Sequence, residues 1–144
     1  MTNDQQKILP LNDDDQKRLI EQRAIIEKHL GNQESIEKYK KPAGKLGLLR
    51  ALLEKKVFTQ DQTYELQCMG IVLGDVFVDD MGFRWVIVQD QYGRDPAIQY
   101  KQTSIILYPL TMISKRIERG EVVDVFELYN GIVAQVEKLT KEKI

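Results

Sequence analysis

With 144 residues, 42% of them apolar and 30% charged, the chain has the size and composition of one folded domain, which excludes intrinsic disorder. A net charge of −1 argues against a nucleic-acid partner. No secretory signal begins the sequence and no apolar run is long enough to span a bilayer. We therefore expect a cytoplasmic protein that does not associate with a membrane.

The N-terminal part predicts a flexible lead-in followed by a helix. Residues 1–12 are polar and contain Pro10, which is typical of a loose terminus. The three aspartates at 13–15 then supply an N-cap and favourable first-turn charge for a helix that runs to about Leu30. Gly31 follows as a stop signal. The folded domain is therefore expected to span the rest of the chain, residues 13–144.

Two more helices are predicted before the middle of the chain. A short polar helix or loop at 35–42 leads into a second main helix at 45–56, which has a broad leucine face. Thr59 and Gln62 have the spacing of a capping box, and they predict the start of a third helix through residues 63–78. Apolar residues surround this third helix on all sides, so we expect it to be buried centrally.

The third helix carries two glycines and an aspartate that need an explanation. Gly70 and Gly74 lie four residues apart and each lowers helix stability, so we expect a tight crossing with another helix or with the sheet. Asp75 lies in an apolar run, and a buried carboxylate needs a partner. We favour a structural ion pair to the sheet over an active-site acid. The basic residues considered as partners are Arg94, Arg84, Lys115 and Arg116.

After Gly82 the spacing of apolar residues changes from the helical period to the alternating pattern of strands. Residues 83–90, 97–101 and 104–108 predict three strands, and the short connections between them predict an antiparallel meander. A helix at 110–119 ends at Gly120. A final helix is predicted after Asp124, which acts as its cap. The expected fold is α+β, with N-terminal and C-terminal helices packed on a small three-stranded antiparallel meander.

Few residues offer catalytic or metal chemistry. With one cysteine, Cys68, and one histidine, His29, the sequence offers no zinc-ligand set and disfavours a Ser-His-Asp or Cys-His catalytic site. Cys68 is expected in the core, and His29 on the surface or at the end of the first helix. No Walker A or GxGxxG loop is present. We expect no cofactor and favour a non-enzymatic role, while an enzyme remains an alternative.

Two long stretches carry a family signature, LGDVFVDDMGFRWVIVQDQYGRDPAI and TSIILYPLTMISKRIERGEVVDV. They resemble the bacterial family called domain of unknown function 3806, and the similarity extends from about Asp13 to Val136. The resemblance implies the α+β fold and a bacterial cytoplasmic setting. It transfers no activity, cofactor or catalytic residue.

The candidate functional surface combines the turn at 90–96 with nearby charges. An exposed turn with an aromatic and a guanidinium is typical of protein recognition, although Arg94 could instead pair locally with Asp90 or Asp95. The basic residues that follow the strands, Lys115, Arg116 and Arg119, could bind an anionic group. The negative charges of Glu118 and Glu121 partly cancel their positive charge. The full set is Asp75, Arg84, Asp90, Tyr92, Arg94, Asp95, Lys115, Arg116 and Arg119.

Charge is distributed unevenly along the chain. Residues 36–57 hold seven basic and two acidic side chains, a net of +5, and residues 58–82 hold five acidic side chains and no basic one. The simplest interpretation is that the two blocks neutralise each other on adjoining helices. The alternative is that opposed charge patches steer a partner. We therefore favour a protein-interaction module with a protein partner, such as an adaptor or an immunity protein that neutralises a toxin, and a homo-oligomer stays possible. The alternatives are a hydrolase or transferase that uses Asp75, Asp90 and Arg94, and a small-ligand sensor.

Overall fold

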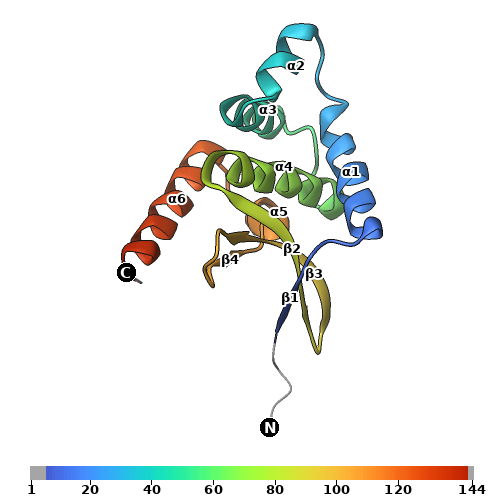
Figure 1. Cartoon of the computed structure of the whole chain (residues 1–144). Helices are drawn as coiled ribbons and strands as arrows, with labels where there is room; N and C mark the ends of the chain where they lie inside the picture. The colour runs from blue at the N-terminus through green and yellow to red at the C-terminus, as the bar shows by residue number, and fades with distance from the viewer. Residues whose placement is uncertain (1–5, 143–144) are drawn as a thin grey trace.

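Helix α4 runs through the middle of the molecule and the other elements pack around it (Figure 1). The computed structural model describes residues 6–142. The elements in this range are β1 (Lys7–Leu9), α1 (Asp13–Glu27), α2 (Gln33–Tyr39), α3 (Pro42–Glu54), α4 (Thr63–Met81), β2 (Phe83–Asp90), β3 (Gly93–Tyr100), β4 (Ile106–Leu107), α5 (Leu110–Glu118) and α6 (Val125–Glu142). The predicted α+β class is confirmed. None of the described helices is long and apolar enough to cross a membrane.

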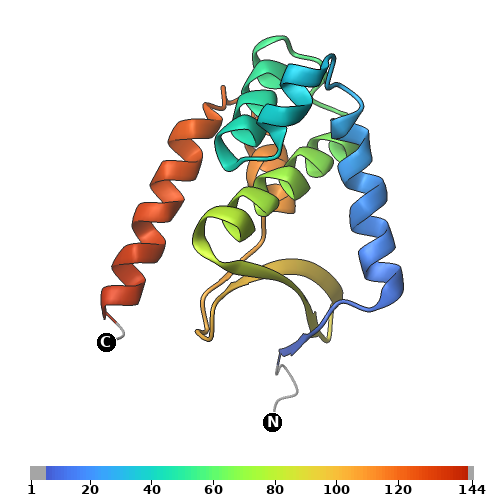
Figure 2. The same ribbon diagram turned by 45° about the horizontal axis from the view of Figure 1, so that its top comes forward.

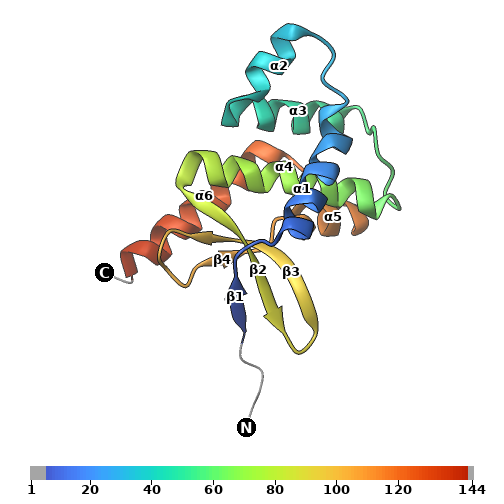
Figure 3. The same cartoon turned by 45° about the vertical axis from the view of Figure 1, so that its right-hand side comes forward.

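The central position of α4 follows from its composition. Its residues from Cys68 to Phe77 are buried on every side, as a helix without a polar stripe requires. Helix α3 lies on one side of α4 and the sheet on the other, and α1 crosses α4 (Figures 1 and 3). Helix α5 lies behind α4 in Figure 2. Helix α6 contacts α3 and lies at the side opposite α1 (Figure 2).

The two glycines of α4 allow close approach by two different elements. A Cβ atom at Gly70 would lie 2.4 Å from the carbonyl oxygen of Pro109 and 2.7 Å from the Cα of Leu110, at the start of α5. A Cβ atom at Gly74 would lie 2.5 Å from the ring of Trp85 on β2. The predicted tight crossing is confirmed, and it involves both a helix and the sheet.

The sheet has four antiparallel strands in the order β1-β2-β3-β4. The predicted meander is present as β2, β3 and β4, although β3 begins at Gly93 and β4 is only two residues long. The fourth strand, β1, pairs with the end of β2, so that Lys7 faces Gln89. Residues 7–9 of the expected lead-in therefore form a strand that pairs with β2. Residues 1–5 of the expected lead-in lie outside the described residues.

Both faces of the sheet are covered by apolar side chains. The main core lies between the sheet and the helices and includes Phe77, Phe83 and Ile98. A smaller cluster on the opposite face is formed by Val86 and Val88 with neighbouring residues of β3 and β4. Burial on both faces explains why β2 has an almost continuous apolar sequence.

The helix caps differ in part from the predictions. Helix α1 is capped by Asn12, whose Oδ1 accepts the Asp15 N–H at 2.8 Å, while the Asp15 carboxylate accepts the Asn12 N–H at 2.9 Å. The prediction that the aspartates provide the N-cap is therefore wrong by one residue. Gln62 accepts the Thr59 N–H at 2.7 Å, but this pair forms a turn before α4 rather than a box on the helix. Asp124 caps α6 as predicted.

Candidate functional site

Asp75 is held by two side chains from different elements. Its carboxylate accepts hydrogen bonds from Arg23 Nε at 2.5 Å, from Arg23 Nη2 at 3.0 Å and from Trp85 Nε1 at 3.0 Å. Arg23 belongs to α1, which crosses α4 at this point. The prediction that the basic partner comes from the sheet or α5 is therefore wrong. The ion pair joins α4 to α1, and Trp85 adds the connection to the sheet.

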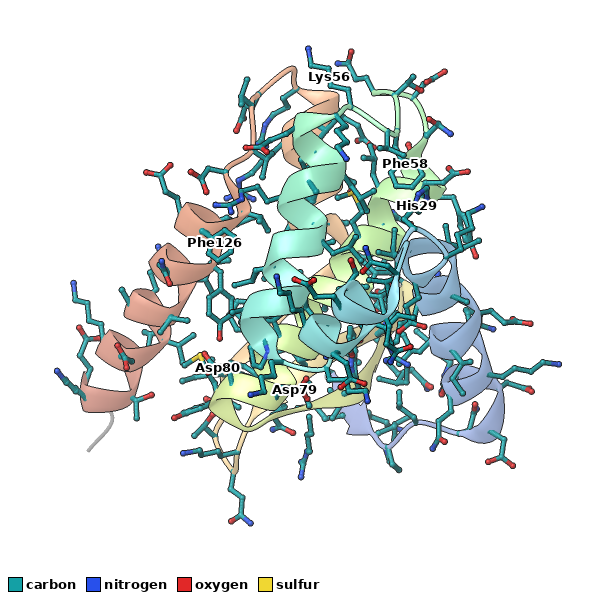
Figure 4. All side chains as sticks on the ribbon, turned by 90° about the horizontal axis from the view of Figure 1, so that it is seen from above. His29, Lys56, Phe58, Asp79, Asp80 and Phe126 are labelled. Carbon is teal, nitrogen blue, oxygen red and sulfur yellow. The ribbon has the colours of Figure 1, made fainter. Side chains whose placement is uncertain are left out.

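A second polar contact lies near the C-terminal end of α4. Lys45 Nζ on α3 donates to the Tyr39 carbonyl oxygen at 2.9 Å and lies 3.3 Å from a carboxylate oxygen of Asp79. Its ammonium group also lies 4.9 Å from the centre of the Tyr39 ring. Burial raises the pKa of the Tyr39 hydroxyl, so this group is neutral at physiological pH. These contacts tie α2 and α3 to the C-terminal half of α4, where Figure 4 places Asp79.

Arg94 reaches from the β2–β3 hairpin to the start of α1. Its two terminal nitrogens lie 3.0 and 3.1 Å from the carboxylate oxygens of Asp15, a bidentate pair. The Arg94 guanidinium holds the pKa of Asp15 below its usual range, against the opposing effect of burial. Local pairing of Arg94 with Asp90 or Asp95, one of the two sequence interpretations, is therefore wrong.

The tip of this hairpin presents one aromatic side chain to solvent. Tyr92 is 86% exposed, and its N–H donates to Asp90 Oδ1 at 2.8 Å. Asp95 is exposed as well. The hairpin extends away from the helices (Figure 3). Because the Arg94 guanidinium is engaged with Asp15, the exposed tip offers Tyr92 and two carboxylates.

The remaining predicted surface residues lie elsewhere. Arg84 donates to Gln99 Oε1 at 2.7 Å on the sheet face that points away from α4. On α5, Lys115 is exposed and Arg116 donates to the Met112 carbonyl oxygen at 2.7 Å. Arg119 forms an ion pair with Glu121 at 2.8 Å. The nine predicted residues therefore occupy several separate places rather than one surface.

A groove that the sequence did not predict lies at the N-terminal end of α4. It has a volume of about 800 Å³ and lies between the C-terminal ends of α3 and α5, where Figure 4 places Lys56 and Phe58. Buried side chains line its inner part, with partly buried ones beside them. The apolar lining consists of Leu52, Leu53, Phe58, Leu66, Met69, Ile117, Val122 and Val123.

The mouth of the groove combines an exposed valine with charged side chains. Val122 is 99% exposed, in the segment between α5 and α6. The charged lining residues are Glu54, Lys56, Asp61, Glu118 and Glu121. We call these five residues the rim.

Hydrogen bonds hold the segments around the groove together. Gln60 Nε2 donates to the Glu118 carbonyl oxygen at 2.8 Å, and the Thr63 hydroxyl donates to the Glu118 carboxylate at 3.0 Å. The ring of Phe58 packs edge-on against His29, with 5.7 Å between the ring centres (Figure 4). His29 lies just beyond the C-terminal end of α1, as expected, and is partly buried there. Its Nε2 is buried without a hydrogen-bond partner in the described part of the chain.

Two other predictions concern chemistry. Cys68 is fully buried as expected, and burial raises the pKa of its thiol to about 11, which keeps it protonated at neutral pH. Within residues 6–142, no group of three or more histidine, cysteine, aspartate and glutamate side chains is arranged to hold a metal ion.

The groove gave weak signals in the sequence. Phe58 has the position of a residue that packs back on a helix start, and Val122 and Val123 lie outside the predicted helices. Apolar residues in connecting segments, outside every predicted helix and strand, are the sequence feature that points to the groove. The groove itself could not be predicted, because residues 52–69 and 117–123, which are far apart in the chain, form it together.

One solved structure shares the fold. It is a crystal structure of a protein from Bacteroides thetaiotaomicron VPI-5482 at 1.50 Å resolution, with a TM-score of 0.70 and 12% sequence identity. The match covers 89% of this chain and 47% of that chain, so this chain spans about half the length of the solved protein.

The curated proteins and the family models give different results. No curated protein matches the chain. A family model described as Domain of unknown function (DUF3806) matches residues 45–129, which is more than half of the chain and includes the groove. The chain therefore belongs to the DUF3806 family.

Proposed function

We propose that this chain is a non-enzymatic protein-interaction module, and that its groove binds apolar side chains of a partner protein. The observation that carries the proposal is the groove itself, with its volume of about 800 Å³, its apolar inner part and the almost fully exposed Val122 at its mouth. Apolar pockets with a polar margin are the usual sites of binding-energy hot spots. Burying Val122 and the groove lining would supply the hydrophobic part of the affinity.

An adaptor or a toxin-neutralising immunity protein is the cellular role that we favour within this class. Both act by covering a surface of another protein, which needs a rigid docking site and no catalytic group. The groove fits this requirement because α3, α4 and α5 form its walls.

A small-ligand sensor is the second candidate, because the groove volume also falls in the range of ligand pockets. The exposed Val122 favours a protein partner, since it extends the apolar surface beyond the cavity. The enzyme alternative has less support. Asp75 already accepts three hydrogen bonds, and Arg94 pairs with Asp15 rather than with Asp75 or Asp90.

A random peptide library displayed on phage tests the proposal. Peptides selected on the wild-type protein are synthesised, and their affinities are measured by fluorescence anisotropy for the wild type, for Val122→Asp and for Phe58→Ala. We expect each groove variant to weaken binding by about tenfold or more, because each removes apolar contact area at the centre of the site. Circular dichroism checks that both variants are folded.

Ile20→Asp is the matched control. Ile20 is also an exposed aliphatic residue, at 61%, but it lies on α1 and does not line the groove. The control should leave peptide affinity unchanged. Selected peptides that bind the groove variants as tightly as the wild type would contradict the proposal, and binding of small molecules alone would favour the sensor.

A further inference from the structure

The rim of the groove is negatively charged. Four of its five residues are carboxylates, namely Glu54, Asp61, Glu118 and Glu121, and Lys56 is the single basic member. All five are exposed. The rim therefore has a net charge of −3 at neutral pH.

Most of this charge has no ion-pair partner in the described part of the chain. Glu121 pairs with Arg119 at 2.8 Å. Glu118 and Asp61 accept hydrogen bonds from the hydroxyls of Thr63 and Thr59, which are neutral donors. The Thr59 hydroxyl also lowers the pKa of Asp61, so this carboxylate stays ionised at neutral pH. Among residues 6–142, no ion pair with a basic side chain is recorded for Asp61, Glu118 or Glu54.

Two helix ends add to the negative potential. Glu54 is the last residue of α3 and Glu118 is the last residue of α5. The C-terminus of a helix carries a partial negative charge, so a carboxylate at this position is unfavourable for the helix. A cation on a bound partner would interact favourably with both the carboxylate and the helix end.

We infer that the occupant of the groove is a cationic amphipathic segment of a partner protein. Its apolar side chains fill the groove, and its lysine or arginine side chains lie against Glu54, Asp61 and Glu118. The inference rests on the proposed function and adds the chemistry of the partner. Complementary charge at an interface speeds association and excludes partners of the wrong sign.

The test uses the same phage-displayed peptide library, which is selected separately on the wild-type protein and on a variant whose rim charge is reversed. Peptides selected on the wild type should be enriched in lysine and arginine beside their apolar residues. The double variant Glu54→Lys with Glu118→Lys should lose this enrichment, and it should bind the wild-type peptides about tenfold more weakly. The affinity of these peptides for the wild-type protein should also fall as salt is raised, because exposed charges are screened.

The matched control is Glu21→Lys with Glu137→Lys. Both glutamates are exposed, on α1 and α6, and neither lines the groove, so the control has the same change in net charge. It should keep the lysine and arginine enrichment and bind the wild-type peptides with less than about a twofold change. An equal loss in the rim variant and the control would overturn the inference, because it would reflect net charge alone.

The outcomes separate this inference from the proposed function. If Val122→Asp weakens binding but the selected peptides are neutral or acidic, the groove is a docking site and the inference about charge is wrong. If peptides bind and Val122→Asp has no effect, the proposed function fails. If no peptide is selected and Val122→Asp disperses a dimer of the wild-type protein in analytical ultracentrifugation, the occupant is a second copy, which also overturns the inference.

Discussion

The two ends of α4 differ in how they use their charged residues. At the C-terminal half, Asp75 and Asp79 each meet a basic side chain from another helix, and these pairs hold α1 and α3 in place. At the N-terminal end, Glu54, Asp61 and Glu118 surround an apolar groove and form no ion pair with any residue between 6 and 142. An aspartate in an apolar run can thus be a structural element, while exposed glutamates on the surface border the proposed docking groove.

The largest loss of stability is expected at Asp75. Asp75→Ala leaves Arg23 without its counter-charge and Trp85 Nε1 without its acceptor, so we expect the free energy of unfolding to fall by about 3 kcal/mol. Urea denaturation measures the change. Asp79→Ala is the control, because Asp79 is 42% exposed and its removal should lower stability by less than about 1 kcal/mol. Equal losses in the two variants would contradict a structural role specific to Asp75.

A smaller loss of stability is expected where α4 meets α5. Gly70→Ala would place a methyl group 2.4 Å from the Pro109 carbonyl oxygen, which forces the two elements apart and should lower stability by about 2 kcal/mol. Gly131→Ala on α6 is the matched control, since its Cβ meets no atom within 4 Å. It should raise the free energy of unfolding by about 0.5 kcal/mol through helix propensity. A tolerated alanine at Gly70 would show that the crossing is looser than described.

The contribution of the Arg94–Asp15 ion pair to stability should depend on pH. The pKa of Asp15 is lowered in the folded state, so the pair stabilises the protein above the ordinary aspartate pKa and this contribution disappears as pH falls through the folded-state value. Arg94→Ala should therefore lower the melting temperature at neutral pH and have progressively less effect under acid conditions. Arg18→Ala, which removes a weaker contact at 3.7 Å, should have a smaller effect. A melting-temperature difference that is independent of pH would count against the pair.

The smallest expected effect on stability lies at the groove. Val122→Asp should change the free energy of unfolding by no more than about 0.5 kcal/mol, because Val122 is 99% exposed. The same change should weaken peptide binding. Urea denaturation of this variant tests whether the groove end of α4 serves binding while the other end serves folding. A large loss of stability would remove this distinction.

Much of the fold could be predicted because it depends on local patterns. The helical periods place α1, α3, α4, α5 and α6, and the propensity cost of Gly70 and Gly74 correctly indicates close packing. The strand β1 could not be predicted in the same way, because Lys7–Leu9 is too short to establish an alternating pattern. Its stability comes from pairing with β2.

The contacts at the candidate site depend on tertiary structure. Asp75 pairs with Arg23 across 52 residues, and Asp15 pairs with Arg94 across 79. Asp75 and Arg94 were recognisable in the sequence as residues that need a partner. The candidates for Asp75 did not include Arg23, and those for Arg94 did not include Asp15. The choice is made by the angle at which α1 crosses α4 and by the length of the β2–β3 hairpin, neither of which is encoded in a local pattern.

The position of the single tryptophan has a practical consequence for experiments. Trp85 donates to Asp75, packs against Gly74 and does not line the groove. Its indole emission therefore reports the junction of α1, α4 and the sheet, and it should shift when the protein unfolds but remain constant when the groove is filled. Intrinsic fluorescence thus provides a label-free measure of folding that does not depend on whether the groove is occupied. A ligand that changes the emission would bind at a site other than the groove.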